Sequence, residues 1–74
     1  MEEKVLEIVN SILESKEQSK VDKLILSYSL RDDLGFTSFD LAELTVRLED
    51  EFDIDIFEDG LVDTINEVLS KLKN

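Results

Sequence analysis

Residues 34–52, with the sequence LGFTSFDLAELTVRLEDEF, carry the clearest structural signals in the chain. Gly35 can adopt backbone angles that are closed to other residues, which suits a tight turn before a helix. Thr37 and Asp40 form a Thr-x-x-Asp pattern that is typical of a capping box at a helix N-terminus. With Thr37 as the N-cap, Ser38 is the first helical residue, and its hydroxyl is expected to point outward beside amides that lack partners. A phosphate ester is well placed at such a position.

The predicted central helix has two contrasting faces. At about 100° per residue, one stripe is apolar and is expected to be buried; it consists of Leu41, Leu44, Leu48 and Phe52. The opposite stripe sets two apolar side chains among carboxylates; it consists of Phe39, Glu43, Val46 and Asp50. Apolar side chains on an acidic outer face are commonly contact points for a partner. Glu43 and Arg47 are four residues apart in the favourable order and predict an exposed ion pair worth about 0.3–0.5 kcal/mol.

Two further helices are predicted. The first runs from about residue 2 to residue 15, and its apolar stripe follows helical spacing: Val5, Ile8, Val9, Ile12 and Leu13. The last begins with a capping box formed by Thr64 and Glu67. Its buried stripe is expected to contain Ile65, Val68, Leu69 and Leu72.

The two connections are harder to predict. Residues 16–36 are expected to be pinned to the core, with a short helical turn near residues 21–26; the pinning side chains are Val21, Leu24, Ile25, Leu26, Tyr28 and Leu30. After the central helix, Ile54 and Ile56 are expected to point inward from an extended link, followed by a short helical turn near residues 58–62. The predicted fold is all-α: one domain over residues 1–74, a small bundle of three main helices plus one short helical turn.

Composition excludes several classes of function. The net charge of −11 argues against nucleic-acid binding, which needs a basic surface. The chain has neither cysteine nor histidine, so it offers no disulfide framework and no usual zinc site, and no EF-hand register fits the acidic segment. No apolar run reaches membrane-spanning length, and the acidic N-terminus is unlike a secretory signal. A soluble cytoplasmic monomer with no metal and no membrane contact is expected.

The acidic residues are unevenly distributed. Residues 31–63 hold twelve acidic and two basic side chains, whereas residues 1–30 hold six acidic and four basic ones. Because complementary charge steers association and selects partners, this block predicts a partner with a basic surface.

The motif Leu34-Gly35-Phe36-Thr37-Ser38-Phe39, the helix that follows it and the acidic-aromatic run over residues 49–56 together resemble the acyl carrier protein family. Members of that family carry a Leu-Gly-x-Asp-Ser-Leu motif, whose serine accepts 4′-phosphopantetheine from coenzyme A. The sequence departs from the family pattern at three positions. Thr37 replaces the usual aspartate, Phe39 replaces the usual leucine, and Phe57 stands where proline is common. Threonine retains the capping function without the charge.

The resemblance implies a carrier protein and not an enzyme. An acyl or aminoacyl group would be held as a thioester on a 4′-phosphopantetheine arm attached to Ser38, and the absence of histidine argues against catalysis by Ser38 itself. The implied partners are a phosphopantetheinyl transferase and acyl-loading and acyl-processing enzymes with basic docking surfaces. Their expected contacts are Phe39, Asp40, Glu43, Val46, Arg47 and Asp50.

The resemblance covers carriers of fatty acid, polyketide and nonribosomal peptide biosynthesis alike. The alternative is an unmodified acidic helical interaction module, in which the same fold has lost the carrier role. The threonine at position 37 is consistent with that alternative.

Overall fold

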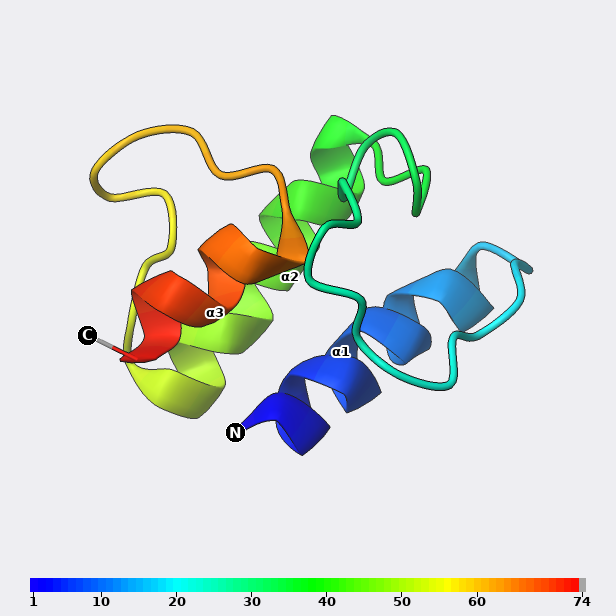
Figure 1. The fold of residues 1–74 in the computed structure, drawn as a ribbon, viewed down its shortest axis with the longest axis horizontal. Coiled ribbons are helices and arrows are strands. Elements are labelled where there is room, and N and C mark those ends of the chain that lie inside the picture. Colours follow the sequence, from blue (N-terminus) through cyan, green and yellow to red (C-terminus); the bar gives the residue numbers. More distant parts are fainter. Residues whose placement is uncertain (74) are drawn as a thin grey trace.

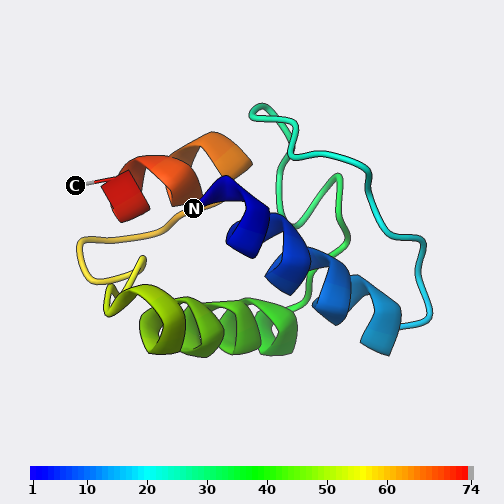
Figure 2. The same cartoon turned by 90° about the horizontal axis from the view of Figure 1, so that it is seen from below.

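The computed structural model describes residues 1–73 and contains three helices, α1 (Glu2–Ser15), α2 (Ser38–Phe52) and α3 (Ile65–Lys73). The α1–α2 connection lies at one end of the molecule and the α2–α3 connection at the other (Figure 1, Figure 2). The predicted all-α bundle of three main helices is confirmed. None of these three helices combines the length and the apolar character needed to cross a bilayer.

Capping boxes begin two of the helices, as predicted. At α2, Asp40 N donates to Thr37 Oγ1 at 3.3 Å and Thr37 N donates to Asp40 Oδ2 at 2.8 Å. At α3, Glu67 N donates to Thr64 Oγ1 at 3.1 Å and Thr64 N donates to Glu67 Oε1 at 2.9 Å. Backbone N–H groups of Thr64 and Asp63 hold the pKa of the Glu67 carboxyl below its usual value. These reciprocal bonds satisfy amides that a helix start leaves free.

The apolar stripes of the three helices form one core, and the predicted stripes are confirmed with one adjustment. Phe52 at the end of α2 is only partly buried, because it packs against the edge of the core. Segments outside the helices contribute further side chains to the core. The buried residues from these segments are Leu30, Leu34, Phe36, Ile56 and Val62.

The predicted helical turn near residues 21–26 is wrong. The side chain of Asn10 pairs with both backbone groups of Val21, donating to its carbonyl at 2.9 Å and accepting from its N–H at 2.8 Å. A helical turn would need these groups for its own hydrogen bonds, so the segment stays extended and bends. Leu26 is 51% exposed and does not pin the connection, whereas Leu30 is fully buried.

A hydrogen-bonded latch, which the sequence did not predict, joins the α1–α2 connection to the start of α3. Ser29 and Thr64 form an isolated antiparallel bridge, with Leu30 N donating to Asp63 O at 2.7 Å. Ser29 is buried, and its hydroxyl donates to Asp63 Oδ1 at 2.9 Å. This latch closes the long connection over the core.

In the α2–α3 connection, Ile54 and Ile56 were predicted to point inward. Ile56 is fully buried and Ile54 is partly buried. The predicted helical turn near residues 58–62 is displaced to residues 56–59, where the chain forms turns but no helix. Asp55 explains the displacement, because its side chain accepts from Phe57 N at 2.9 Å and starts the turn early.

Candidate functional site

Ser38 is the first residue of α2 and is exposed. The first intrahelical bond runs from Leu41 N to Thr37 O at 2.9 Å, so the amides of Ser38 and Phe39 precede the helical ladder. Such amides, at the positive end of the helix dipole, favour an anionic group nearby. The structure therefore confirms that Ser38 is an exposed first helical residue, a position at which helix-terminal amides favour a phosphate ester.

The turn before Ser38 is held from several sides. Gly35 has φ of +70°, a conformation that explains the requirement for glycine at this position. Phe36 anchors the turn, because its ring is buried and its N–H donates to Leu30 O at 2.8 Å. The Thr37–Asp40 capping box then fixes the first turn of α2.

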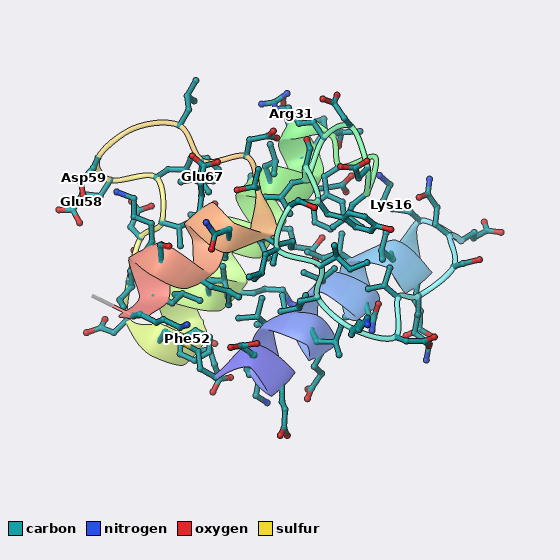
Figure 3. The ribbon with its side chains drawn as sticks, viewed as in Figure 1. Lys16, Arg31, Phe52, Glu58, Asp59 and Glu67 are labelled. Carbon is teal, nitrogen blue, oxygen red and sulfur yellow. The ribbon has the colours of Figure 1, made fainter. Side chains whose placement is uncertain are left out.

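Lys16, which follows the last residue of α1, reaches this turn (Figure 3). Its ammonium lies 2.6 Å from Gly35 O and 2.6 Å from Asp40 Oδ2, and it lies 5.6 Å from the centre of the Phe36 ring. The last distance is within the range of a cation–π interaction. Lys16 thus links the end of α1 to both sides of the serine turn.

The electrostatic state of Asp40 follows from these contacts. Burial raises the pKa of the Asp40 carboxyl, but hydrogen bonds from Lys16 and Thr37 together with the charge of Lys16 outweigh that effect and hold it below its usual value. The lowered pKa favours the ionised form of Asp40. Its side chain is only 13% exposed, so the cap and Lys16 already occupy much of this predicted partner contact.

The outer face of α2 carries the other predicted contacts. Phe39 is 88% exposed and Val46 is 65% exposed, whereas the opposite stripe is buried. Glu43 and Asp50 are exposed on the same helix. The helix thus presents two apolar side chains between carboxylates, as the periodicity predicted.

Arg47 forms the predicted pair with Glu43, with 3.7 Å between Nη1 and Oε2. This distance is longer than a hydrogen bond, and Nη1 is buried without a hydrogen-bond partner among the described residues, so the attraction to Glu43 is electrostatic only. Arg47 also lines a groove between α1 and α2, together with Lys4, Asp50 and Glu51. It therefore lies at the border of the outer face and not at its centre.

Lys16 is the site residue that sequence reasoning missed. It lies 24 positions from Asp40, beyond the range of any local pattern. A capping box predicts the bonds between Thr37 and Asp40 but leaves open which cation approaches the aspartate. Its position just after a predicted helix end was the available signal, since it placed Lys16 at a terminus of α1.

The sequence matches the family model described as "Phosphopantetheine attachment site" over residues 3–72. It is 32% identical to an acyl carrier protein of Buchnera aphidicola over 76 aligned positions, which cover 100% of this chain and 91% of that protein. It is 37% identical to an acyl carrier protein of Syntrophus aciditrophicus, covering 99% of this chain and 89% of that protein. It is 33% identical to an acyl carrier protein of Trieres chinensis, and this alignment covers 88% of this chain and 84% of that protein. No solved structure gives a significant match.

The family match covers all but one terminal residue each of α1 and α3, the whole of α2 and the turn at Ser38. Proteins of this kind carry covalent phosphopantetheine and are carriers, not enzymes. The chain therefore belongs to the acyl carrier protein family, whose members attach phosphopantetheine.

Proposed function

We propose that Ser38 is the attachment residue, and that the chain carries an acyl or aminoacyl group between enzymes. The observation that carries the proposal is the exposed hydroxyl of Ser38 at the start of α2, inside a turn fixed by a capping box. Among the seven serines of the chain, this one combines exposure with a position beside free helix-terminal amides.

Attachment requires a phosphopantetheinyl transferase and coenzyme A. The Ser38 oxygen attacks the phosphorus that bears the pantetheine, an O–P bond forms, and the pyrophosphate bond of coenzyme A breaks. The adenosine bisphosphate leaves with the bridging oxygen, and the hydroxyl proton passes to a base on the transferase. The chemistry supplied by the attached arm is that of a terminal thiol, which holds the cargo as a thioester.

The partner face is proposed to be the outer side of α2. Phe39 and Val46 would supply apolar contacts, and Glu43 and Asp50 would attract basic side chains of the transferase and of loading or processing enzymes. Arg47 would lie at the rim of this contact. Asp40 would act chiefly through the cap that orients Ser38.

The experiment is incubation with coenzyme A and a broad-specificity phosphopantetheinyl transferase. Because the chain has no cysteine, modification creates its only thiol, so a thiol reagent and intact mass give independent counts. We expect one added group and one thiol on the wild type, none on Ser38→Ala, and one on the control Ser70→Ala, which changes an exposed serine in α3. Modification that persists in Ser38→Ala overturns the assignment. A wild type that stays unmodified, both in this reaction and when purified from its native host, favours the unmodified interaction module.

A further inference from the structure

We infer that Lys16 is a positioning residue for the modification of Ser38, because it fastens the end of α1 to both sides of the turn that presents the serine. The inference rests on the proposed function of Ser38. It adds to that function a residue at the end of α1, one that lies outside the motif and outside the outer face of α2.

The geometry makes Lys16 a two-point tether. Its ammonium donates to Gly35 O, which precedes the serine, and to Asp40 Oδ2, which follows it, both at 2.6 Å. An ammonium group has three donors, and two of them are used within this turn. Ser38 therefore lies in a six-residue span, residues 35–40, whose two ends are joined through one cation.

Burial strengthens the tether. The Lys16 side chain is 19% exposed and the Asp40 side chain 13% exposed, in contrast to the Lys20–Glu14 pair, whose side chains are 59% and 61% exposed. Surface pairs like the second contribute little, because water screens them. Removing one partner of a mostly buried pair leaves a poorly solvated charge behind.

The effect of losing Lys16 follows from the double role of Asp40. The same oxygen, Oδ2, accepts from Lys16 and from Thr37 N. Without the cation, the Asp40 carboxylate is better solvated when it turns toward water. That movement breaks the hydrogen bond that Thr37 N donates to Asp40 Oδ2. Ser38 lies between Thr37 and Asp40, so its hydroxyl would then sample several directions.

A misoriented Ser38 hydroxyl should slow the transfer step more than it weakens binding of the carrier to the transferase. The exposed apolar contacts of α2 include Val46, which is remote in sequence from the serine turn and is held by the helix itself. Displacements of about 1 Å at reacting atoms can lower rates by up to about 100-fold. The inference therefore predicts a fall in kcat with little change in the KM for the carrier.

The test compares four proteins: the wild type, Lys16→Met, Lys16→Arg and the matched control Lys20→Met, which makes the same charge change in an exposed pair. Transferase kinetics are measured at a temperature where circular dichroism shows every variant folded. Amide hydrogen exchange of Thr37 and Asp40 is followed in parallel by NMR, without the transferase.

We expect Lys16→Met to lower kcat by about tenfold or more and to change KM less than about twofold. Exchange at Thr37 and Asp40 should accelerate in the same variant. Lys16→Arg, which keeps the charge and the donors, should restore most of the rate, and Lys20→Met should keep the wild-type kcat. If Lys16→Met is unfolded at all temperatures, Lys16→Gln, which keeps a donor, takes its place in the same comparison.

Equal kcat values for Lys16→Met and Lys20→Met overturn the inference, even if Lys16→Met melts at a lower temperature. Unchanged amide exchange overturns it independently of any transferase. A wild type that is not modified at all contradicts the proposed function instead, so the two failures are distinguishable.

Discussion

Leu44 and Val46 lie two residues apart on α2, yet Leu44 is fully buried and Val46 is 65% exposed. Two residues correspond to about 200° of rotation on a helix, so the pair samples opposite faces. This contrast separates substitutions that test folding from substitutions that test partner contact.

Leu44→Ala removes volume from a packed core and should lower the free energy of unfolding by about 2–5 kcal/mol. Val46→Asp adds a charge on the solvent side and should change it by no more than about 0.5 kcal/mol. Thermal and denaturant melts of both variants provide the measurement. A strongly destabilised Val46→Asp protein would contradict the exposed position of this residue.

Glu43→Lys tests the charge of the outer face. The substitution reverses an exposed charge and should raise the KM of the transferase or loading enzyme several-fold, while the protein stays folded. Glu14→Lys is the control, since it makes the same charge change at an exposed position of α1. Loading rates of Glu43→Lys and Val46→Asp that both equal the wild-type rate would assign this face to ordinary solvated surface.

Local patterns predicted the helices well for a physical reason. Residues three or four positions apart form the capping boxes at Thr37 and Thr64 and the apolar stripes. Such short spacings can be recognised in the sequence alone. Ser38 was placed by the same logic, because its position follows from the cap before it.

The connection over residues 16–36 was predicted poorly because distant partners shape it. Asn10 holds Val21 across 11 positions, and Ser29 meets Asp63 across 34 positions. A hydrogen bond from a single polar side chain to a backbone group far away in the sequence does not recur at a regular spacing, so no sequence pattern predicts it. The Lys16 tether escaped prediction for the same reason.

Ser29→Ala tests the latch between the α1–α2 connection and α3. The buried hydroxyl donates to Asp63 Oδ1 and accepts from Asp32 N, so its removal leaves both groups without that partner. We expect a loss of about 1–3 kcal/mol in the free energy of unfolding. Ser27→Ala is a suitable control, because Ser27 is exposed on the same connection. Equal free energies of unfolding for the two variants would show that the Ser29 hydroxyl does not stabilise the fold.

Salt should stabilise the fold, because like charge is concentrated in residues 31–63. Glu58 illustrates the arrangement, since its side chain projects outward from the α2–α3 connection (Figure 3), whereas the neighbouring Asp59 lies 3.3 Å from Lys71 Nζ. Raising sodium chloride toward 0.1 M shortens the Debye length to about 10 Å and should raise the melting temperature. Glu58→Lys should show a smaller increase. A flat or falling wild-type melting temperature would contradict the dominance of self-repulsion.

Acid should weaken the contribution of the Lys16–Asp40 pair. The pKa of Asp40 is lowered in the folded protein by hydrogen bonds from Lys16 and Thr37, against the effect of burial. A group with a lowered folded-state pKa contributes stability that is fully present above its unfolded-state pKa and is lost as the pH falls through the folded-state pKa. The Lys16–Asp40 pair therefore stabilises the fold at neutral pH, and this contribution is lost in acid.

The wild type alone is a poor reporter of this effect, because acid also relieves the repulsion among the other carboxylates. The difference in melting temperature between the wild type and Lys16→Met isolates the pair. We expect that difference to be largest near neutral pH and to shrink as the pH falls below about 4, where free carboxyl groups titrate. The corresponding difference for Lys20→Met should be small throughout, since that pair is exposed. A Lys16→Met difference that persists unchanged into acid would show that Lys16 stabilises the turn through Gly35 O and Phe36 and not through the charge of Asp40.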